Sequence, residues 1–427
     1  MRYSIILTGG QSMADAQTAC TKVGARDVKV EQRLGMVFCE LTAEQAVILI
    51  SQGFKLKEVK STGTAQIAAP TEPLDEAIMT ALGLNISELF NGFRGSFTPP
   101  LTGIGLTVVV ADTGIRKTHE SLSGKVIYEE NFSDAPDCDD LYNHGTAVAY
   151  LVAGGTHGSI NSGVAPDAKI INLKCLNDKG EGTDEWLIDA INKACDLVEQ
   201  ARTANKPTYD PSYPNVINIS VGAADDGDPD DPVRTACRTA VEKYGLQVIA
   251  ASGNAGDKPS TILNPACEPS VIAIGGLRSD LFAVWEYSSR GPTQEGEVKP
   301  DFCFWATSIH AASSEGDDKY TYKTGTSFST PIASGLIGLI WELGRRTFGP
   351  GWTVTWYDIS EVGEQVCVKA EGVPLRKDNS WGYGLPAVDL VAQGASRAAP
   401  ALAGTEVVTA FLPLVIMLPL VSMFRRA

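Results

Sequence analysis

The sequence predicts an α/β protein with a parallel sheet and helices on both faces, preceded by a small α+β domain. Two observations lead to this expectation. From Leu106 onward, short runs rich in β-branched residues alternate with helical stretches, which is typical of a parallel sheet with right-handed crossovers. The first sixty residues instead follow a strand–helix–strand–strand–helix–strand order, which is typical of a ferredoxin-like domain.

Local signals define the elements of this N-terminal domain. Apolar residues at helical spacing predict a helix over Ser12–Val23, which ends at Gly24. The run Thr42-Ala43-Glu44-Gln45 has the form of a capping box and opens a second helix that stops at Gly53. Strands are predicted over Arg2–Leu7, Asp27–Gln32, Gly35–Glu40 and Phe54–Val59.

The larger part of the chain alternates between buried strands and helices. Strands are predicted over Thr107–Ala111, Lys169–Cys175, Val216–Ile219 and Leu246–Ala250. Helices are predicted over His144–Ala153, Thr183–Ala201, Pro232–Tyr244 and Ser327–Phe348. In such sheets the functional site forms at the carboxyl ends of the strands, so we expect it beside Asp112.

Bulk composition excludes several classes of protein. A chain of 427 residues with 44% apolar residues is long and apolar enough for two or three folded domains. The formal net charge of -16 argues against a nucleic-acid partner, because phosphates require a basic surface. Nine cysteines without a C-x-x-C pair indicate buried free thiols, although a Cys237–Cys267 bridge stays open. Four histidines disfavour a His-rich zinc site.

Four short motifs carry complementary chemistry. In chain order they supply an acid, a base, an amide donor and a nucleophile, which a serine hydrolase needs because a serine hydroxyl is a poor nucleophile unaided. The motifs are Ala111-Asp112-Thr113-Gly114, Asn143-His144-Gly145-Thr146, Ser252-Gly253-Asn254-Ala255 and Gly325-Thr326-Ser327-Phe328-Ser329-Thr330-Pro331.

Each candidate has a definite role in this hypothesis. Ser327 is the nucleophile, His144 the general base, Asp112 the carboxylate that orients it, and Asn254 the oxyanion donor. Taken singly, Ser327 is equally typical of a helix cap and Asn254 of a turn. The D-T-G motif also occurs in aspartic proteases, but those need two such carboxylates and the chain has one such motif.

Together the motifs resemble the subtilisin-like serine proteases, the subtilase family, from about Leu106 to Val391. The stretches Ser289-Arg290-Gly291-Pro292, Lys299-Pro300-Asp301 and Trp381-Gly382-Tyr383-Gly384 are also similar to that family. The resemblance implies a serine endopeptidase that cleaves polypeptides through an acyl-enzyme and needs no cofactor. It also allows structural calcium, for which the sequence has no loop of diagnostic ligand spacing.

The resemblance also implies substrate contacts. Ser220, Val221 and Gly222 would lie beside the bound peptide as an added strand, opposite a wall formed by Ala251, Ser252 and Gly253. The following acidic residues, Asp225 and Asp226, resemble the specificity loop of kexin- and furin-type subtilases. A solvated acidic loop or a loose calcium site are the alternatives.

Residues 1–69 resemble the inhibitory propeptide of subtilases. The tail over Lys60–Ala69 would then enter the cleft like a product, inhibit the enzyme and be cut by it; a permanent accessory domain is the alternative. The remaining divisions are a linker with the start of the catalytic region at 70–105, the peptidase domain at 106–391, a linker at 392–406 and an apolar segment at 407–424.

The C-terminal segment leaves the location open. Val407–Phe424 is uncharged, spans 18 residues and precedes Arg425 and Arg426, so we expect a transmembrane anchor and a membrane-associated or extracellular enzyme. Met1-Arg2, however, leads directly into a strand without a signal peptide. Three explanations would reconcile these two observations. The start codon is wrongly placed, the chain is tail-anchored with its enzyme in the cytoplasm, or the C-terminal segment is a removable sorting signal.

Two further classes of function compete with a protease. The chain could be a catalytically inactive subtilase scaffold for peptide binding or membrane display, although all four chemical positions are intact. It could also be an esterase that uses the same three residues.

Overall fold

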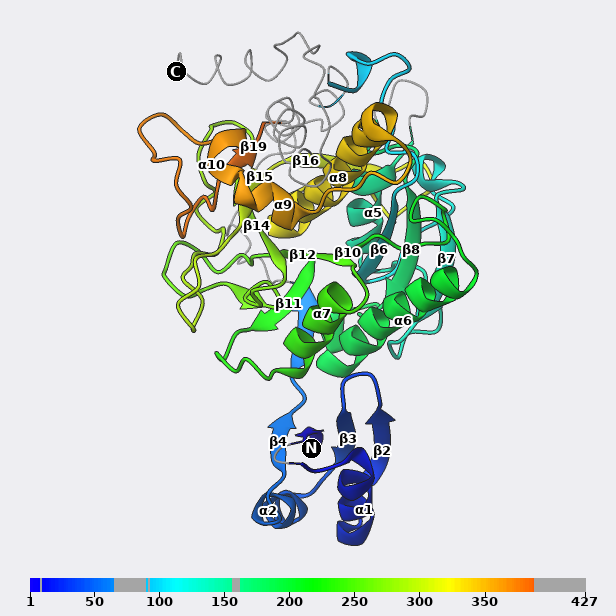
Figure 1. Cartoon of the computed structure of the whole chain (residues 1–427), viewed down its shortest axis with the longest axis vertical. Coiled ribbons are helices and arrows are strands. Elements are labelled where there is room, and N and C mark those ends of the chain that lie inside the picture. Colours follow the sequence, from blue (N-terminus) through cyan, green and yellow to red (C-terminus); the bar gives the residue numbers. More distant parts are fainter. Residues whose placement is uncertain (8–9, 65–89, 91–92, 156–161, 388–427) are drawn as a thin grey trace.

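The computed structural model describes residues 1–7, 10–64, 90, 93–155 and 162–387. Figure 1 shows a small N-terminal unit, drawn in blue, beside a much larger α/β unit. The linker predicted at 392–406 and the apolar segment Val407–Phe424 lie outside the described residues. Within the described ranges, no helix combines the length and apolarity that crossing a membrane requires.

The larger unit is built on a seven-stranded sheet in the order β15-β14-β12-β10-β6-β8-β7. Every neighbouring pair in this sheet is parallel, as the alternation of strands and helices predicts. The strands are β6 (Thr107–Asp112), β7 (Val126–Asn131), β8 (Lys169–Lys174), β10 (Val216–Ile219), β12 (Gln247–Ala251), β14 (Ile272–Leu277) and β15 (Phe302–Trp305).

Helices cover both faces of this sheet. One face packs against α5 (Gly145–Ala153) and α8 (Thr326–Phe348), and the other against α6 (Asp184–Thr203) and α7 (Pro232–Glu242). Strand β6 shows the reason, because Val108 and Val110 belong to the first core and Val109 and Ala111 to the second. Side chains alternate along a strand, so an uninterrupted apolar run serves two cores.

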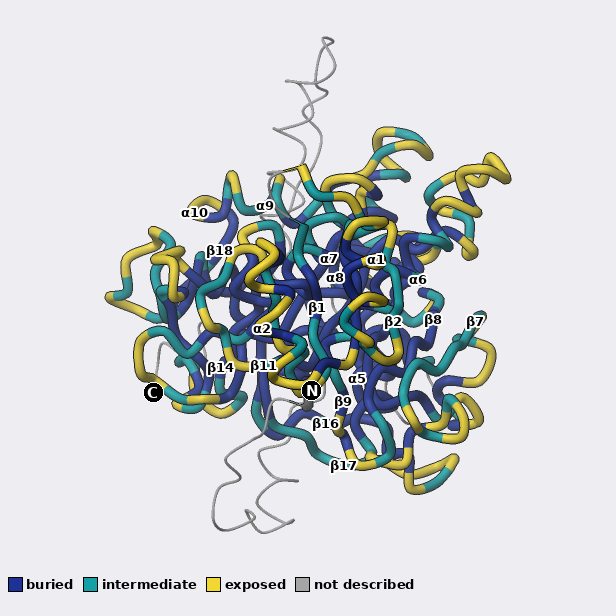
Figure 2. The backbone as a smooth tube through the Cα atoms, turned by 90° about the horizontal axis from the view of Figure 1, so that it is seen from below, coloured by how far each residue is buried: buried dark blue, intermediate teal, exposed yellow. Residues whose placement is uncertain are grey.

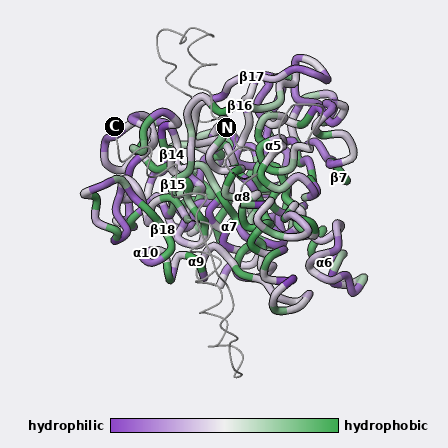
Figure 3. Tube along the Cα trace, turned by 90° about the horizontal axis from the view of Figure 1, so that it is seen from above, coloured by the Kyte–Doolittle hydropathy of each residue, from purple (hydrophilic) through white to green (hydrophobic). Residues whose placement is uncertain are grey.

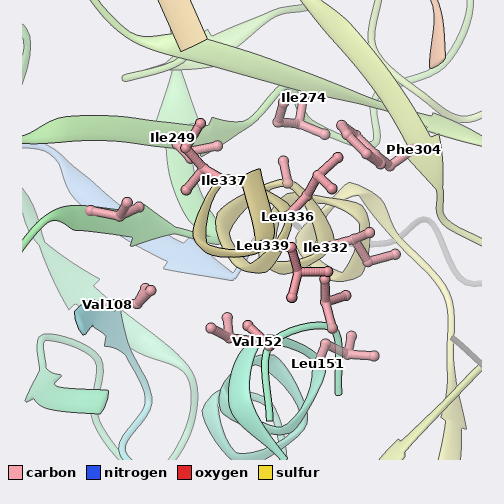
Figure 4. Close-up of a cluster of buried hydrophobic side chains, with 14 of the residues drawn as sticks. Val108, Leu151, Val152, Ile249, Ile274, Phe304, Ile332, Leu336, Ile337 and Leu339 are labelled. Carbon is pink, nitrogen blue, oxygen red and sulfur yellow. The ribbon is translucent and has the colours of Figure 1, made fainter. Parts of the chain in front are cut away.

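Helix α8 runs through the first core. Figure 4 shows Ile332, Leu336, Ile337 and Leu339 on α8 among residues of α5 and the strands. Each such buried side chain contributes about 1.5–3 kcal/mol. In Figure 2 the buried, dark blue stretches of the backbone lie toward the middle of the molecule, and in Figure 3 hydrophobic, green stretches lie in the same central region. The position of the N-terminal turn of α8 is therefore fixed by the packing of the rest of the helix in this core.

Shorter elements complete the larger unit. They are η1 (Glu120–Leu122), β9 (Glu181–Thr183), β11 (Val221–Ala224), β13 (Leu263–Asn264), β16 (Ile309–Ala312), β17 (Tyr320–Lys323), α9 (Trp356–Glu361), α10 (Gly363–Val366), β18 (Cys367–Val368) and β19 (Leu385–Pro386).

The N-terminal unit has the predicted order and its own core. Its antiparallel sheet runs β2-β3-β1-β4, and both helices begin with capping boxes, at Ser12 and Thr42. The core includes Ile5, Cys20 and Leu49. The elements are β1 (Arg2–Ile6), α1 (Met13–Val23), β2 (Arg26–Glu31), β3 (Met36–Glu40), α2 (Ala43–Ser51) and β4 (Lys55–Glu58).

A short strand connects the two units. β5 (Ser61–Thr64) leaves the N-terminal unit and enters a second sheet of the larger one, in the order β13-β11-β5-β9. It is antiparallel to both β11 and β9. In Figure 1 this strand rises from the blue unit into the region of β11.

The cysteines form no disulfide bonds. All nine are free thiols, eight of them buried and Cys138 partly so. The Cys237–Cys267 bridge left open by the sequence is not formed. Burial raises the pKa of both thiols, so they stay protonated inside the core.

Candidate active site

A buried carboxylate and an imidazole meet at the carboxyl end of the central sheet. Asp112 is the last residue of β6, and His144 is the residue from which α5 begins. The two are joined by a 2.7 Å hydrogen bond between His144 Nδ1 and Asp112 Oδ1, and Thr113 N donates to the same oxygen at 2.7 Å. Asp112 is fully buried and His144 is 8% exposed, so water competes little for this contact.

The turn after β6 and the start of α5 are tied together. The hydroxyl of Thr113 donates to Asp140 at 2.8 Å and accepts from Gly145 N at 2.9 Å, and Thr146 N donates to Asp140 at 2.9 Å. A Cβ at Gly145 would lie 2.2 Å from the Gly114 oxygen. Only glycine lets the backbones approach this closely, and the approach brings His144 to Asp112.

Lys174 supports the same turn from the neighbouring strand. It is the last residue of β8, lies opposite Asp112 in the β6–β8 register and is fully buried. Its ammonium donates to Thr113 O at 2.5 Å, Asp139 O at 2.6 Å and Asp178 Oδ1 at 2.8 Å. Neither Lys174 nor Asp140 was predicted from the sequence; a lysine at the end of a mostly apolar strand was the available signal for Lys174.

Ser327 lies in the first turn of α8. Gly325 precedes the helix with φ +144°, a backbone region that favours glycine. The Ser327 hydroxyl donates to Ser220 O at 2.9 Å. The ring of the next residue, Phe328, lies 5.2 Å from that of His144 between centroids, so this turn of α8 packs against the imidazole.

Ser327 and His144 are not hydrogen-bonded to each other in the described part of the chain. Hydrogen bonds of catalytic groups are often long before substrate binds and tighten in the complex. The structure therefore brings Asp112 and His144 into direct contact and packs Phe328, the residue after Ser327, against His144.

Asn254 contacts the residue before Ser327. Its Oδ1 accepts from both the backbone N and the hydroxyl of Thr326, at 2.9 Å each. With Oδ1 engaged in this way, Nδ2 is the donor end of the side chain. A Cβ built on Gly325 would lie 3.4 Å from that Nδ2, so the amide donor lies beside the N-terminus of α8, where backbone N–H groups lack helical partners.

The predicted substrate segments border the strand that leaves the N-terminal unit. Val221 pairs with Thr64 and Gly222 with Gly63, and Ser220 precedes them. On the opposite side of β5, Thr62 pairs with Gly182 of β9. An extended segment of the chain itself therefore occupies the position that the resemblance assigns to a bound peptide.

The other predicted wall is connected to this region through Leu263. Ala251 ends β12, and the oxygen of Ser252 accepts from Leu263 N at 2.9 Å. Leu263 lies in β13, which pairs with β11. Gly253 N donates to the Thr326 hydroxyl at 3.2 Å, so this segment reaches the start of α8 as well.

The acidic loop divides into two parts. Asp225 accepts from Gly227 N at 3.0 Å within its own turn and from Gln294 N at 3.4 Å. Asp226 instead pairs with Lys60 at 2.8 Å and Lys57 at 3.4 Å. Burial alone would raise the pKa of Asp226, but the Lys60 hydrogen bond and the charges of both lysines lower it to about 2.

No metal centre accompanies these groups in the described ranges. Among those residues, no cluster of three or more His, Cys, Asp and Glu side chains is arranged to hold a metal ion. The residues named above can carry proton transfer and nucleophilic attack.

Comparison with known proteins gives a consistent result. A model described as the subtilase family matches residues 103–384. Serine protease AprX of Bacillus subtilis (strain 168) is 32% identical over 265 residues, covering 56% of this chain and 58% of that protein. The thermophilic serine proteinase of Bacillus sp. (strain AK1) is 33% identical over 248 residues, covering 57% and 53%.

The fold comparison agrees. The solved structure of sphericase is similar with a TM-score of 0.57 and 26% identity, covering 70% of this chain and 96% of that one. The chain spans little more than half the length of the two bacterial proteases above.

Proposed function

Because the chain belongs to the subtilase family, we propose that it is a serine endopeptidase that hydrolyses polypeptides with Asp112, His144 and Ser327. The observation that carries this proposal is the buried 2.7 Å bond between Asp112 and His144 beside the helical turn of Ser327. The names of the similar proteins are those of serine proteases, which supports the same activity.

The proposed mechanism uses only side chains and backbone of this chain. Asp112 holds Nδ1 of His144 protonated, which leaves Nε2 as the base. His144 takes the Ser327 proton while Oγ attacks the peptide carbonyl, and then gives that proton to the leaving amine. Water, activated by the same imidazole, hydrolyses the acyl-enzyme. Asn254 Nδ2 and the Ser327 N–H would stabilise the oxyanion.

We propose that residues 1–69 are a propeptide that inhibits the site and is then removed by it. The pairing of β5 with both β9 and β11 supports this, because a peptide substrate would use the same edges. Gly63 lies opposite Gly222 and Thr64 opposite Val221. Continued by one position, that register would reach Ser220, whose oxygen contacts the Ser327 hydroxyl, so the expected cut follows Ala65.

The test compares wild type with Ser327→Ala. We expect wild type to yield a mature form that begins at Gln66 by mass spectrometry, to react with a fluorophosphonate at Ser327 and to digest casein. Ser327→Ala should remain full-length and unlabelled. The matched control is Ser329→Ala, two residues further along the helix. The Ser329 hydroxyl donates to Thr326 O at 2.9 Å within its own helix, and its loss should change neither result.

Other outcomes would support other functions. A folded wild type that is neither processed nor labelled favours the inactive scaffold. Hydrolysis of simple esters without digestion of casein favours an esterase.

A further inference from the structure

Asp184 lies where β5 crosses the start of α6. Its Oδ1 accepts the Thr62 hydroxyl at 2.7 Å, and its Oδ2 accepts Lys60 N at 2.9 Å. In return, Asp184 N donates to Lys60 O at 3.1 Å. Asp184 is 3% exposed and Thr62 is 2% exposed, so these contacts are sheltered from water.

The helix itself does not need this carboxylate. Thr183 is the cap of α6, since its side chain accepts from Trp186 N at 3.3 Å. Both oxygens of Asp184 are engaged by the docked segment, one by a side chain and one by its backbone. The carboxylate of Asp184 is therefore directed toward the segment Lys60–Thr62 and not toward its own helix.

A second acidic group receives the side chain of Lys60. The Lys60 ammonium lies 2.8 Å from Asp226 and 3.8 Å from Asp231. Asp231 is fully buried, and its Oδ1 caps α7 by accepting from Val233 N at 2.9 Å. Its Oδ2 faces Lys57 at 2.8 Å. When the N-terminal unit leaves, Lys57 leaves with it, and a buried carboxylate loses its nearest cation.

Resting on the proposed function, we infer that the cleft selects polypeptides with a lysine two residues before a threonine or serine, as in Lys60-Ser61-Thr62. Asp184 recognises the hydroxyl, and Asp226 with Asp231 recognises the ammonium. With cleavage after Ala65, these are the sixth and fourth residues before the cut. An apolar residue in place of Thr62 would leave a buried carboxylate oxygen without its donor, which is costly.

The test uses quenched-fluorescent peptides of residues 59–69, Val-Lys-Ser-Thr-Gly-Thr-Ala-Gln-Ile-Ala-Ala, with the self-processed wild-type enzyme. Thr62→Val keeps the shape and removes the hydroxyl, and we expect kcat/KM to fall about tenfold or more. Thr62→Ser should retain most of the activity. Lys60→Met should cost about two- to fivefold, because this pair is partly exposed, and Lys60→Arg should cost less.

Enzyme variants connect each preference to its residue. Asp184→Ala should cleave the parent peptide and its Thr62→Val form at similar rates, and Asp226→Asn should do the same for the parent and its Lys60→Met form. The control is Asp318→Asn, an exposed carboxylate beside Lys319, which should keep both preferences. If a variant does not fold, the peptide series with wild type still decides.

The possible failures are distinguishable. Digestion of casein and of every peptide at equal efficiency overturns the inference alone, as does digestion of casein without the parent peptide. Failure to cleave casein and all peptides overturns the proposed function and this inference with it.

Discussion

Ser220 and Ser327 are joined by two reciprocal hydrogen bonds. The Ser327 hydroxyl donates to Ser220 O at 2.9 Å, and the Ser220 hydroxyl donates to Ser327 O at 2.8 Å while it accepts from Asn218 Nδ2 at 2.9 Å. The strand end that would bind substrate is thus fastened to the turn of the proposed nucleophile. A change in one is transmitted directly to the other.

Ser220→Ala should therefore destabilise the protein. It leaves the Ser327 oxygen and the Asn218 amide buried without this partner, so we expect the free energy of unfolding to fall by about 1–3 kcal/mol. Urea unfolding of the Ser327→Ala background measures it without self-digestion. An unchanged midpoint would contradict the structural role assigned to this pair.

Asn254→Ala should lower kcat far more than it changes KM, because its amide is proposed to act on charge that develops only in the transition state. The expected loss in kcat is about 10² to 10³, a magnitude taken from removal of the oxyanion-hole asparagine of subtilisin. Steady-state kinetics on casein-derived peptides separates the two constants. A rise in KM with unchanged kcat would assign Asn254 to ground-state binding instead.

Lys174→Met should destabilise the turn that carries Asp112. The buried ammonium donates to two carbonyls and to Asp178, whose side chain is 27% exposed. Its removal leaves these carbonyl oxygens without this donor, so we expect the free energy of unfolding to fall by about 1–3 kcal/mol. The matched control is Lys179→Met, because Lys179 is exposed on the next turn. Equal unfolding free energies of the two variants, measured in urea, would argue against this role.

Added salt should weaken the binding of the N-terminal unit to the larger unit. Its basic residues face acidic ones of α6 and the acidic loop, with Arg2 2.8 Å from Glu185, Lys29 2.5 Å from Asp189 and Lys57 paired with the loop. Raising ionic strength from about 0.1 M to 1 M shortens the screening length from about 10 Å to 3 Å. In Ser327→Ala, hydrogen exchange of the β5 amides should become faster when sodium chloride is added and should not when sucrose is added. Equal exchange rates with and without sodium chloride would show that apolar contacts dominate.

The docked tail should also respond to pH. Burial raises the pKa of Asp184 to about 6, an increase that the charge of Asp231 reinforces and that the Thr62 and Lys60 contacts oppose. A carboxyl whose pKa is raised by folding stabilises the folded form most below its unfolded value, near pH 4, and this contribution is lost as the pH rises through about 6. The expected loss between pH 4 and pH 7 is about 2 kcal/mol.

Urea unfolding of Ser327→Ala across that range provides the measurement. Adding Asp184→Asn should remove this part of the pH dependence. Asp226 acts elsewhere, since its pKa is lowered to about 2 and its contribution is lost only as the pH falls below about 4. An identical pH profile with and without Asp184→Asn would contradict the assignment.

Much of the fold was predictable because its signals are local. The capping box at Thr42 and the strand over Val216–Ile219 were predicted and are confirmed. The helix boundaries shifted by a residue or two, as at α6, which runs to Thr203 and not Ala201. Such boundaries depend on packing as well as on the sequence near them.

The site was only partly predictable for a related reason. Asp112 and His144 lie in short motifs whose residue types indicate acid–base chemistry, and the structure contains the hydrogen bond between their side chains. Asp184 stands in no such motif, and as sequence it is an ordinary acidic residue in the first turn of a helix. Its partners Lys60 and Thr62 lie 124 and 122 positions away.

The amino-acid sequence by itself determined the parallel α/β architecture, the ferredoxin-like unit before it and the family, because apolar periodicity, caps and short motifs act over a few neighbouring residues. Only the tertiary structure decided that Asp226 faces Lys60 while Asp225 contacts Gln294, and that Asp184 contacts the segment Lys60–Thr62. Those outcomes depend on β5 entering between β9 and β11. Contacts between segments so distant are set by how the whole chain packs, which no local pattern records.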